Sequence, residues 1–193
     1  MGSSNLEMAQ GLNYKLKPGQ PIIVSNMPSQ KVITVSIQGD PNEQTSRVMP
    51  PLYASAYAVR KFFIEEHDQK FSVEKLRGRW PDANAQRVKK QWTGTYALPV
   101  PNDTRKLESI KPEKQVPGVT VALATWEYGA VGQILHVGPY TKEGPTIQSL
   151  RTFVEKQGYQ IVPNSHEEIY LTDPTKADPD KMRTLILCRL AKK

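Results

Sequence analysis

One stretch of the chain, Gly132–Leu187, constrains the fold most because it places a carboxylate inside an apolar strand. In this stretch an apolar strand, a Gly-Pro turn and a bounded helix precede a second strand that carries Glu168. Alternate side chains of a strand share a face, so we expect Glu168 and Tyr170 on one face. Ile169 and Leu171 are expected on the other face, packed on a helix. A buried carboxylate without a partner is costly, which indicates a pocket or a charged partner for Glu168.

The order of predicted elements occurs twice along the chain. Each half has a strand ending at a glycine turn, a helix opened by proline, and two further strands. The first helix is predicted to begin at Pro50-Pro51, and the second is bracketed by Gly144-Pro145 and Gly158. This pattern predicts an α+β fold of duplicated strand-helix-strand-strand units, with helices on one sheet face and a ligand groove on the other. The predicted strands span 31–39, 70–80, 90–99, 119–128, 130–137, 159–171 and 184–190, and a turn-rich segment at 173–180 joins the last two.

Proline and glycine also indicate how the chain is divided. Pro18, Gly19 and Pro21 interrupt regular structure near the start, so residues 1–20 are expected to form a flexible arm. Residues 21–193 are expected to form a single domain. Its two pseudo-symmetric halves, about 21–100 and 118–193, are joined by a proline-rich linker at 101–117.

Composition limits the classes of protein that remain. The 193 residues carry a formal net charge of +7, but the basic residues are dispersed along the chain. No helix-turn-helix pattern lies near the densest basic stretch, Arg77–Lys90, so no DNA-binding domain is expected. No apolar run approaches the ~20 residues of a membrane span, and no apolar leader is evident, so a cytoplasmic location without a membrane partner is expected. The single cysteine, Cys188, is expected to be a small buried core residue.

Aromatic residues beside small ones predict a binding surface for a planar, apolar molecule. Gly94, for example, lies between Trp92 and Tyr96 on one face of a predicted strand. Packing in the core is the alternative for each tryptophan, and stacking of single-stranded bases on Trp80 and Trp92 is a further one. The candidate ligand-binding residues are Trp80, Trp92, Tyr96, Trp126, Tyr128, Glu168 and Tyr170.

For proton transfer, the sequence offers Glu168 as the candidate general base and Tyr170 as the candidate proton donor or relay. An ion pair between Glu168 and an arginine such as Arg183 is the structural alternative. Glycine spacing fits no nucleotide-binding loop, so no cofactor is expected. No metal site is expected either, because the three histidines lack the spacing to carboxylates or cysteine that metal ligands show. They are His67, His136 and His166.

Five segments together resemble the GyrI-like small-molecule-binding family, in its stand-alone form without an attached DNA-binding domain. The resemblance implies a duplicated strand-helix-strand-strand fold whose central groove, lined by aromatic residues and a glutamate, binds hydrophobic or drug-like molecules. The groove glutamate of the family matches Glu168. The segments that carry the resemblance are Ile134–Tyr140, Pro145–Ile147 and Glu167–Pro174, extended by Gly39–Asn42 and Leu76–Trp80.

The resemblance implies three alternative functions. The first is binding of a small hydrophobic or aromatic molecule with Glu168 as polar anchor. The second is hydrolysis, since some stand-alone relatives open cyclopropane rings of genotoxic natural products, and Glu168 would then be the general base. The third is a protein-binding module that inhibits its partner, as the gyrase inhibitor of the family does. Arg77 and Arg79 stand where other stand-alone members often have an acid and a bulky apolar residue, which changes the charge of the pocket.

Overall fold

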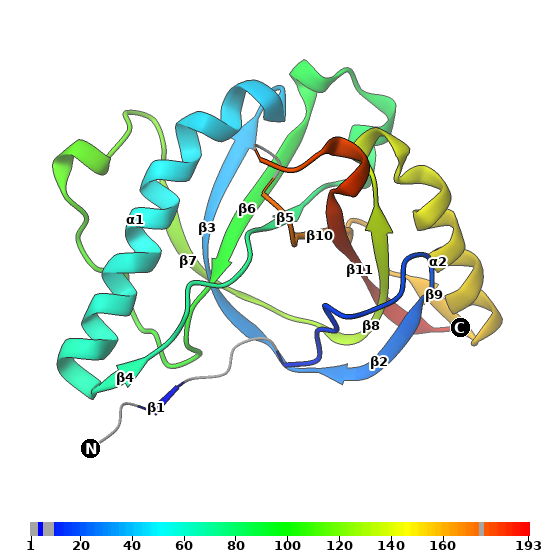
Figure 1. The fold of residues 1–193 in the computed structure, drawn as a ribbon, viewed down its shortest axis with the longest axis horizontal. Coiled ribbons are helices and arrows are strands. Elements are labelled where there is room, and N and C mark those ends of the chain that lie inside the picture. The colour runs from blue at the N-terminus through cyan, green and yellow to red at the C-terminus, as the bar shows by residue number, and fades with distance from the viewer. Residues whose placement is uncertain (1–3, 6–9, 174–175) are drawn as a thin grey trace. The chain divides into compact units, whose positions relative to one another are not determined.

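The computed structural model describes residues 4–5, 10–173 and 176–193, which form two compact units. The first unit contains residues 4–5, 10, 29–75 and 83–127, and the second contains 11–28, 76–82, 128–173 and 176–193. Each unit combines antiparallel strands with an α-helix, which confirms the predicted α+β class (Figure 1). Residues 1–3 and 6–9 of the predicted arm and residues 174–175 of the predicted turn lie outside the described residues. The division into an arm and a single domain stays a prediction.

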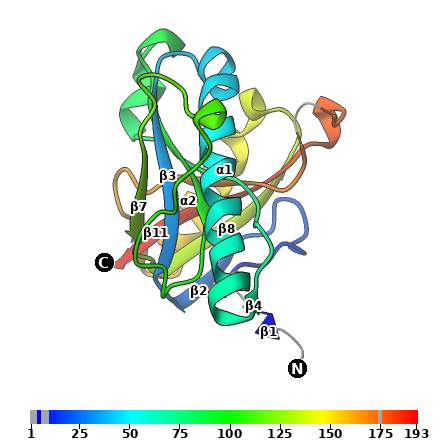
Figure 2. The same ribbon diagram turned by 90° about the vertical axis from the view of Figure 1, so that its left-hand side faces the viewer.

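In the first unit, strand β3 (Gln30–Gln38) lies between β6 (Thr93–Pro99) and β7 (Val121–Trp126) and is antiparallel to both. Helix α1 (Pro41–His67) packs on β3, and the two elements run side by side in Figures 1 and 2. The apolar residues that were predicted at helical spacing are fully buried; they are Leu52, Ala56, Val59 and Phe63. Two short strands, β1 (Ser4–Asn5) and β4 (Gln69–Lys70), pair in parallel beside the helix end.

Helix α1 begins at Pro41, so the predicted start at Pro50 is wrong. The Asp40 side chain accepts a hydrogen bond from the Asn42 backbone N–H at 2.9 Å and caps the helix. Pro41 then takes the first helical position, where its missing N–H costs nothing. Pro50 and Pro51 therefore lie inside the helix, where each removes a backbone donor. No helix of the described residues combines the length and apolarity that a membrane span requires.

In the second unit, an antiparallel sheet has the strand order β2-β8-β11-β10-β5, and β9 pairs with the far end of β11. Short 3₁₀ helices occupy the loops of both units at Asp82–Gln86, Lys89–Gln91, Pro112–Lys114, Tyr140–Lys142 and Pro179–Lys181. The strands of this second sheet are β2 (Ile22–Met27), β5 (Arg77–Arg79), β8 (Gly129–Val137), β9 (Tyr159–Ile161), β10 (Glu167–Tyr170) and β11 (Arg183–Lys192).

Helix α2 (Gly144–Lys156) covers one face of this sheet and follows its predicted bounds closely. Pro145 lies at its start, and Gly158, with φ of 79°, stops it, because a glycine takes this left-handed backbone without strain. Leu150 and Val154 are fully buried from the helix side. They pack against strand residues Ile134, Ile186, Cys188 and Leu190, so Cys188 is a buried core residue, as expected.

The predicted strand 159–171 is two strands in the structure. β9 and β10 are separated by a turn in which Asn164 takes φ of 54°. Asn164 and Asp82 exchange two hydrogen bonds, from the Asp82 N–H to the Asn164 Oδ1 at 3.0 Å and from the Asn164 N–H to the Asp82 Oδ2 at 2.8 Å. Because the two residues lie just beyond β5 and just before β10, this exchange fixes the loop that leads into β10.

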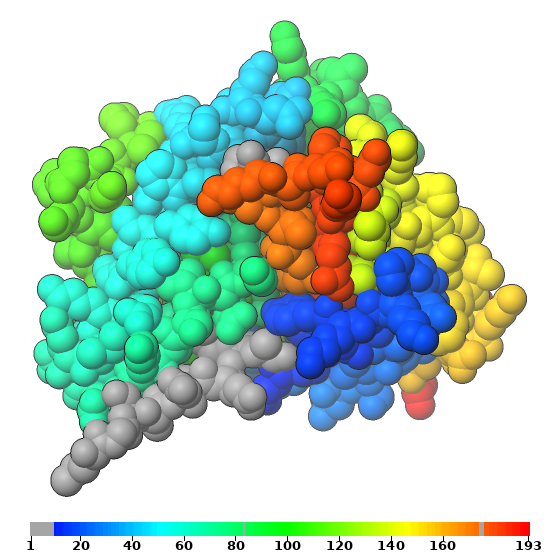
Figure 3. Space-filling view, viewed as in Figure 1, coloured from blue at the N-terminus to red at the C-terminus, as the bar shows by residue number. Residues whose placement is uncertain are grey.

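Residues 11–20 lie along β8 and β11 in the second unit. The Gly19 N–H donates to the Leu135 carbonyl at 3.0 Å, and the Asn13 N–H donates to the Gln133 side chain at 3.1 Å. Arg183 of β11 donates to the Tyr14 carbonyl at 3.3 Å. Figure 3 shows this segment in dark blue beside the red residues of β11.

Gly132 of β8 provides a test of the packing beneath α2. A Cβ atom at this position would lie 3.0 Å from Leu150 Cδ1 and 3.1 Å from Val154 Cγ1. We expect Gly132→Ala to lower the free energy of unfolding, measured with urea, by roughly 1–3 kcal/mol. The matched control is Gly144→Ala, where nothing lies within 4 Å, and it should change stability by less than about 1 kcal/mol. Equal stability of the two variants would contradict this packing.

Candidate active site

Glu168 lies on the face of the second sheet that carries α2. Its partner across the β10–β11 pair is Ile186, which packs against Leu150 and Val154 of α2. Directly paired residues of antiparallel strands point to the same face, so Glu168 and Tyr170 point to the α2 side. The expectation that Ile169 packs on a helix while Glu168 faces away from it is therefore wrong. The alternation of side chains could not show which face carries the helix. Ile169 is fully buried on the face opposite α2, so an apolar residue does not mark the helix side.

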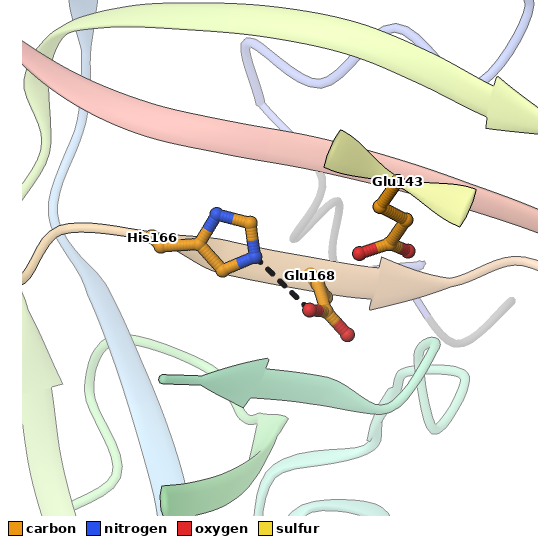
Figure 4. A group of neighbouring side chains, drawn as sticks. All are labelled: Glu143, His166 and Glu168. Atoms are coloured by element: carbon orange, nitrogen blue, oxygen red, sulfur yellow. Dashed lines mark hydrogen bonds and ion pairs between the residues drawn. The ribbon is translucent and has the colours of Figure 1, made fainter. Parts of the chain in front are cut away.

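Three titratable side chains meet beside the start of α2 (Figure 4). Glu168 is on β10, His166 is two residues earlier on the same face, and Glu143 immediately precedes α2. The His166 Nε2 and Glu168 Oε1 atoms are 3.0 Å apart, and one polar atom of each residue lies within 4.8 Å of the others. The side chains of His166 and Glu168 are 16% and 12% exposed, so solvent reaches the cluster.

The cluster holds its protons in an unusual distribution. Burial, the charge of Glu168 and a hydrogen bond with Glu168 raise the pKa of Glu143 to about 8, while His166 opposes the shift. Burial lowers the pKa of His166, but hydrogen bonds with Cys188 and Glu168 and the charge of Glu168 outweigh it and raise this pKa to about 10. At neutral pH, Glu143 is therefore a neutral acid and His166 is an imidazolium that donates to Glu168.

Two carboxylates and a histidine in one cluster are also the donor types that bind metal ions. Here the imidazolium of His166 balances the charge of Glu168, and Glu143 keeps its proton. The cluster is thus electrically compensated by its own groups, and we interpret it as an acid–base group. The expectation that no metal binds stays a prediction.

Aromatic residues lie beside this cluster. The Trp80 indole N–H donates to the Tyr170 hydroxyl at 3.1 Å, and the Tyr140 and Tyr170 rings meet edge to face with centroids 5.7 Å apart. Gly78 permits this arrangement, since a Cβ there would lie 2.6 Å from the Tyr170 hydroxyl oxygen. Trp80, Tyr140 and Tyr170 form what we call the aromatic wall of the second unit.

The opposite face of β10 carries a different network. Glu167 accepts hydrogen bonds from Arg79 Nε at 2.9 Å and from the Tyr128 hydroxyl at 2.8 Å, and Tyr128 accepts one from Arg77 Nη1 at 2.8 Å. Burial, followed by the charge of Glu167, raises the pKa of Tyr128. Tyr128, a candidate ligand-binding residue, is thus paired with Glu167 and Arg77. Glu168 pairs with His166, and Arg183 donates to a backbone carbonyl, contrary to the suggested ion pair between them.

The remaining candidate aromatics, Trp92, Tyr96 and Trp126, belong to the first unit. The Tyr96 hydroxyl shares a hydrogen bond of 2.9 Å with Thr45 of α1, and the Trp92 indole donates to the Arg87 carbonyl at 3.0 Å. Tyr96 and Trp126 are 6% and 7% exposed, which fits the alternative of core packing. Ligand contact by these three residues stays a prediction.

Sequence reasoning missed Glu143 and Tyr140 and dismissed His166 as a metal ligand. The His-x-Glu spacing of His166 and Glu168 on a strand was a usable signal, because residues two apart share a face. Glu143 gave no such signal, since its position before Gly144-Pro145 suggested only a helix start. Its contact with Glu168 depends on how α2 is placed on the sheet.

Comparison with solved structures identifies proteins of the same fold. An uncharacterized conserved protein from Listeria innocua is 26% identical and has a TM-score of 0.74, and the alignment covers 90% of this chain and 93% of that one. A hydrolase from Listeria innocua is 23% identical with a TM-score of 0.75 and coverage of 92% and 95%. The C-terminal domain of EcmrR is 14% identical with a TM-score of 0.57 and coverage of 90% and 98%.

No model of a known protein family matches the chain, and no curated protein matches it. The structural likenesses therefore show a shared fold, and this fold is consistent with the GyrI-like resemblance of the sequence.

The raised pKa of Glu143 predicts how stability depends on pH. Between the unfolded pKa of 4.5 and the folded pKa of about 8, the folded protein retains a proton that the unfolded chain releases. Stability is therefore highest below this window and falls as pH rises through it. Between pH 5.0 and 6.5, where His166 makes a smaller contribution that both proteins share, we expect the unfolding free energy of the unmodified protein to fall by roughly 1–2 kcal/mol more than that of Glu143→Gln.

The control for this measurement is Glu155→Gln, on the exposed side of α2, which should keep the pH dependence of the unmodified protein. The free energy of unfolding of all three proteins is measured with urea at the two pH values. The same pH slope in Glu143→Gln and in the unmodified protein would show that Glu143 is not protonated in the folded state.

Proposed function

We propose that this protein binds an apolar small molecule with an electrophilic carbon and adds water to it at the Glu143–His166–Glu168 cluster. One observation supports this function above all. Glu143 lies in contact with Glu168, and burial together with the charge of Glu168 raises the pKa of Glu143 to about 8, while His166 lies 3.0 Å from Glu168. A carboxylic acid that keeps its proton at neutral pH beside a second carboxyl group is the usual arrangement of a general acid and a general base.

The chemistry assigns one proton transfer to each carboxyl group. Glu168 takes a proton from a water molecule, whose oxygen attacks the electrophilic carbon and forms the new C–O bond. The bond between this carbon and its leaving atom breaks, and the leaving atom takes the electron pair and a proton from Glu143. The product is the substrate plus one water molecule, and a proton passes from Glu168 to Glu143 to restore the site. Positioned proton transfer of this kind contributes roughly 10²–10⁴ in rate.

His166 acts as a positioning residue in this scheme. Its Nε2–H donates to the Glu168 carboxylate at 3.0 Å and fixes the orientation of that carboxylate. His166 also forms a hydrogen bond with Cys188, in which the imidazolium donates and the sulfur accepts, and this contact keeps the ring oriented.

The aromatic wall supports an apolar, planar substrate. Tyr170 shares the face of Glu168 on β10, and Tyr140, at 38% exposure, lies at the surface where a ligand would enter. Apolar walls with few polar groups are typical of small-molecule sites. A strained cyclopropane conjugated to a carbonyl is a substrate of this class, in line with the family resemblance and with the Listeria neighbour of the same fold that is named a hydrolase.

A second candidate function is binding without turnover, in which Glu168 anchors the polar end of a ligand that rests on the aromatic wall. The edge-to-face contact of Tyr140 and Tyr170 favours it, because this surface needs no proton transfer to hold a planar ring. The proposed site contains residues of the second unit only.

We expect Glu168→Gln to lower the rate of water addition to a cyclopropane-containing DNA-alkylating compound by roughly 10²–10⁴, since the amide cannot accept a proton. Glu143→Gln should lose the proton donor and with it the decline of kcat/KM above about pH 8. Mass spectrometry of the water adduct measures the rate.

Glu155→Gln serves as the control and should retain full activity. If all three variants bind the compound and the unmodified protein forms no adduct, the protein is a binder. Adduct formation that is equal in all four proteins would rule out acid–base catalysis by this cluster.

Two variants of Tyr170 distinguish a role in the aromatic wall from a role as proton relay. Tyr170→Phe keeps the ring that meets Tyr140, so we expect the Kd for the same compound, measured by fluorescence titration, to change less than about two-fold. Tyr170→Ala removes the ring and should weaken binding about ten-fold. A Phe variant that binds normally but loses turnover would instead assign Tyr170 as the proton relay.

A further inference from the structure

His136 lies one residue before the end of β8, on the face of the second sheet that carries α2. Its partner across the β8–β11 pair is Thr184, and Thr184 in turn pairs with Tyr170 of β10. Directly paired residues of antiparallel strands point to the same face, so the His136 ring shares the face of Tyr170 and Glu168. His136 is 4% exposed, which means that bulk water does not compete for its ring nitrogens.

Two hydrogen bonds join the His136 ring to the segment that follows β8. The Nε2 atom lies 3.3 Å from the Pro139 carbonyl oxygen, and the Nδ1 atom lies 2.9 Å from the Thr146 hydroxyl. A carbonyl oxygen can only accept, so Nε2 carries a proton and donates it. In the neutral ring, Nδ1 then accepts from the Thr146 hydroxyl, and the two partners together fix the tautomer and the ring orientation.

The two contacts lie on either side of two residues of the proposed site. Pro139 immediately precedes Tyr140 of the aromatic wall, and Thr146 is in the first turn of α2, shortly after Glu143. The Pro139 carbonyl also accepts, at 2.8 Å, the backbone N–H that closes the 3₁₀ turn containing Tyr140. His136 therefore holds this turn at its beginning and holds α2 in its first turn.

The residue that precedes α2 does not secure the start of this helix. Within the part of the chain that the structure describes, the Glu143 side chain makes no capping hydrogen bond to α2, and its carboxyl group contacts Glu168 instead. Gly138, with φ of 127°, lets the chain fold back beside the histidine, and a Cβ there would lie 3.7 Å from His136 Nε2. The ring of His136 thus supplies a side-chain contact at the helix start while the Glu143 side chain is directed to the cluster.

We infer that His136 is a positioning residue of the proposed hydrolytic site, which holds Tyr140 and Glu143 over β10 through its hydrogen bonds with Pro139 and Thr146. The catalytic part of this inference rests on the proposed function, but the placement of Glu143 can be measured without any substrate. Loss of either hydrogen bond lets the segment at 139–146 move toward solvent. The Glu143 carboxyl group then becomes hydrated and moves away from the charge of Glu168.

The test compares Thr146→Val, which keeps the shape of threonine but cannot donate to Nδ1, with Thr146→Ser, which retains the hydroxyl. The carbon NMR signal of the Glu143 carboxyl group, assigned through its loss in Glu143→Gln, reports the titration of this group in the full chain. We expect Thr146→Val and His136→Phe to raise the acid dissociation constant of Glu143 about ten-fold, since hydration stabilises its charged form. Thr146→Ser should change this constant less than about two-fold.

The matched control is Thr141→Val, because Thr141 lies exposed in the same segment, and it should titrate as the unmodified protein does. The free energy of unfolding of each variant is measured with urea. A contact that serves stability alone would lower this free energy without changing the dissociation constant of Glu143. That result in Thr146→Val would overturn the inference, even if His136→Phe fails to fold.

Catalysis provides a separate measurement. If the unmodified protein adds water to the cyclopropane-containing compound, the decline of kcat/KM above about pH 8 should move to lower pH in Thr146→Val and stay in place in Thr146→Ser. If none of the proteins forms the adduct, the hydrolytic function fails, while the titration of Glu143 still decides whether His136 positions it. Turnover by the unmodified protein together with an identical Glu143 titration in every variant would refute the role of His136 alone.

Discussion

The register of β10 between β5 and β11 determines the chemistry of the second unit. Glu167 and Glu168 are consecutive, so the pleat of the strand sends the two carboxylates to opposite faces. Glu168 meets a histidine and a second carboxyl group, whereas Glu167 meets two arginines and a tyrosine. A shift of pairing by one residue would exchange these environments, which means that the apolar pairs Ile186–Leu150 and Ile169–Leu185 protect the chemistry as well as the core.

Both networks lower the stability of the folded state. Buried ionic groups lose hydration that their partners only partly replace, and apolar residues of equal size often give a more stable protein. A short strand with charged groups buried on both sides is therefore better explained by function than by stability.

The sequence predicted the elements whose local signals agree. Helix α2 was recognised from Pro145, Gly158 and the spacing of Leu150 and Val154, because start, stop and buried face all pointed to the same helix. The start of α1 was misplaced, since two signals competed and Pro50 was preferred over the cap at Asp40. Glu168 was recognised as functional from its apolar surroundings, but its face could not be predicted where both faces are buried. Glu143 could not be found at all, because its role arises from a contact between a helix start and a strand distant in sequence.

The two hydrogen bonds that Asp82 and Asn164 exchange have a consequence for when the site forms during folding. They join residues that are 82 positions apart, and β5 belongs to a short segment whose flanking residues lie in the first unit. Closing so long a loop costs entropy that is recovered only when the strands on both sides are paired. During synthesis, the acid–base cluster therefore cannot assemble before β11 has left the ribosome. Until then the nascent chain holds Glu143, His166 and Glu168 as solvated side chains, and the raised pKa of Glu143 arises only once β10 is paired with β11.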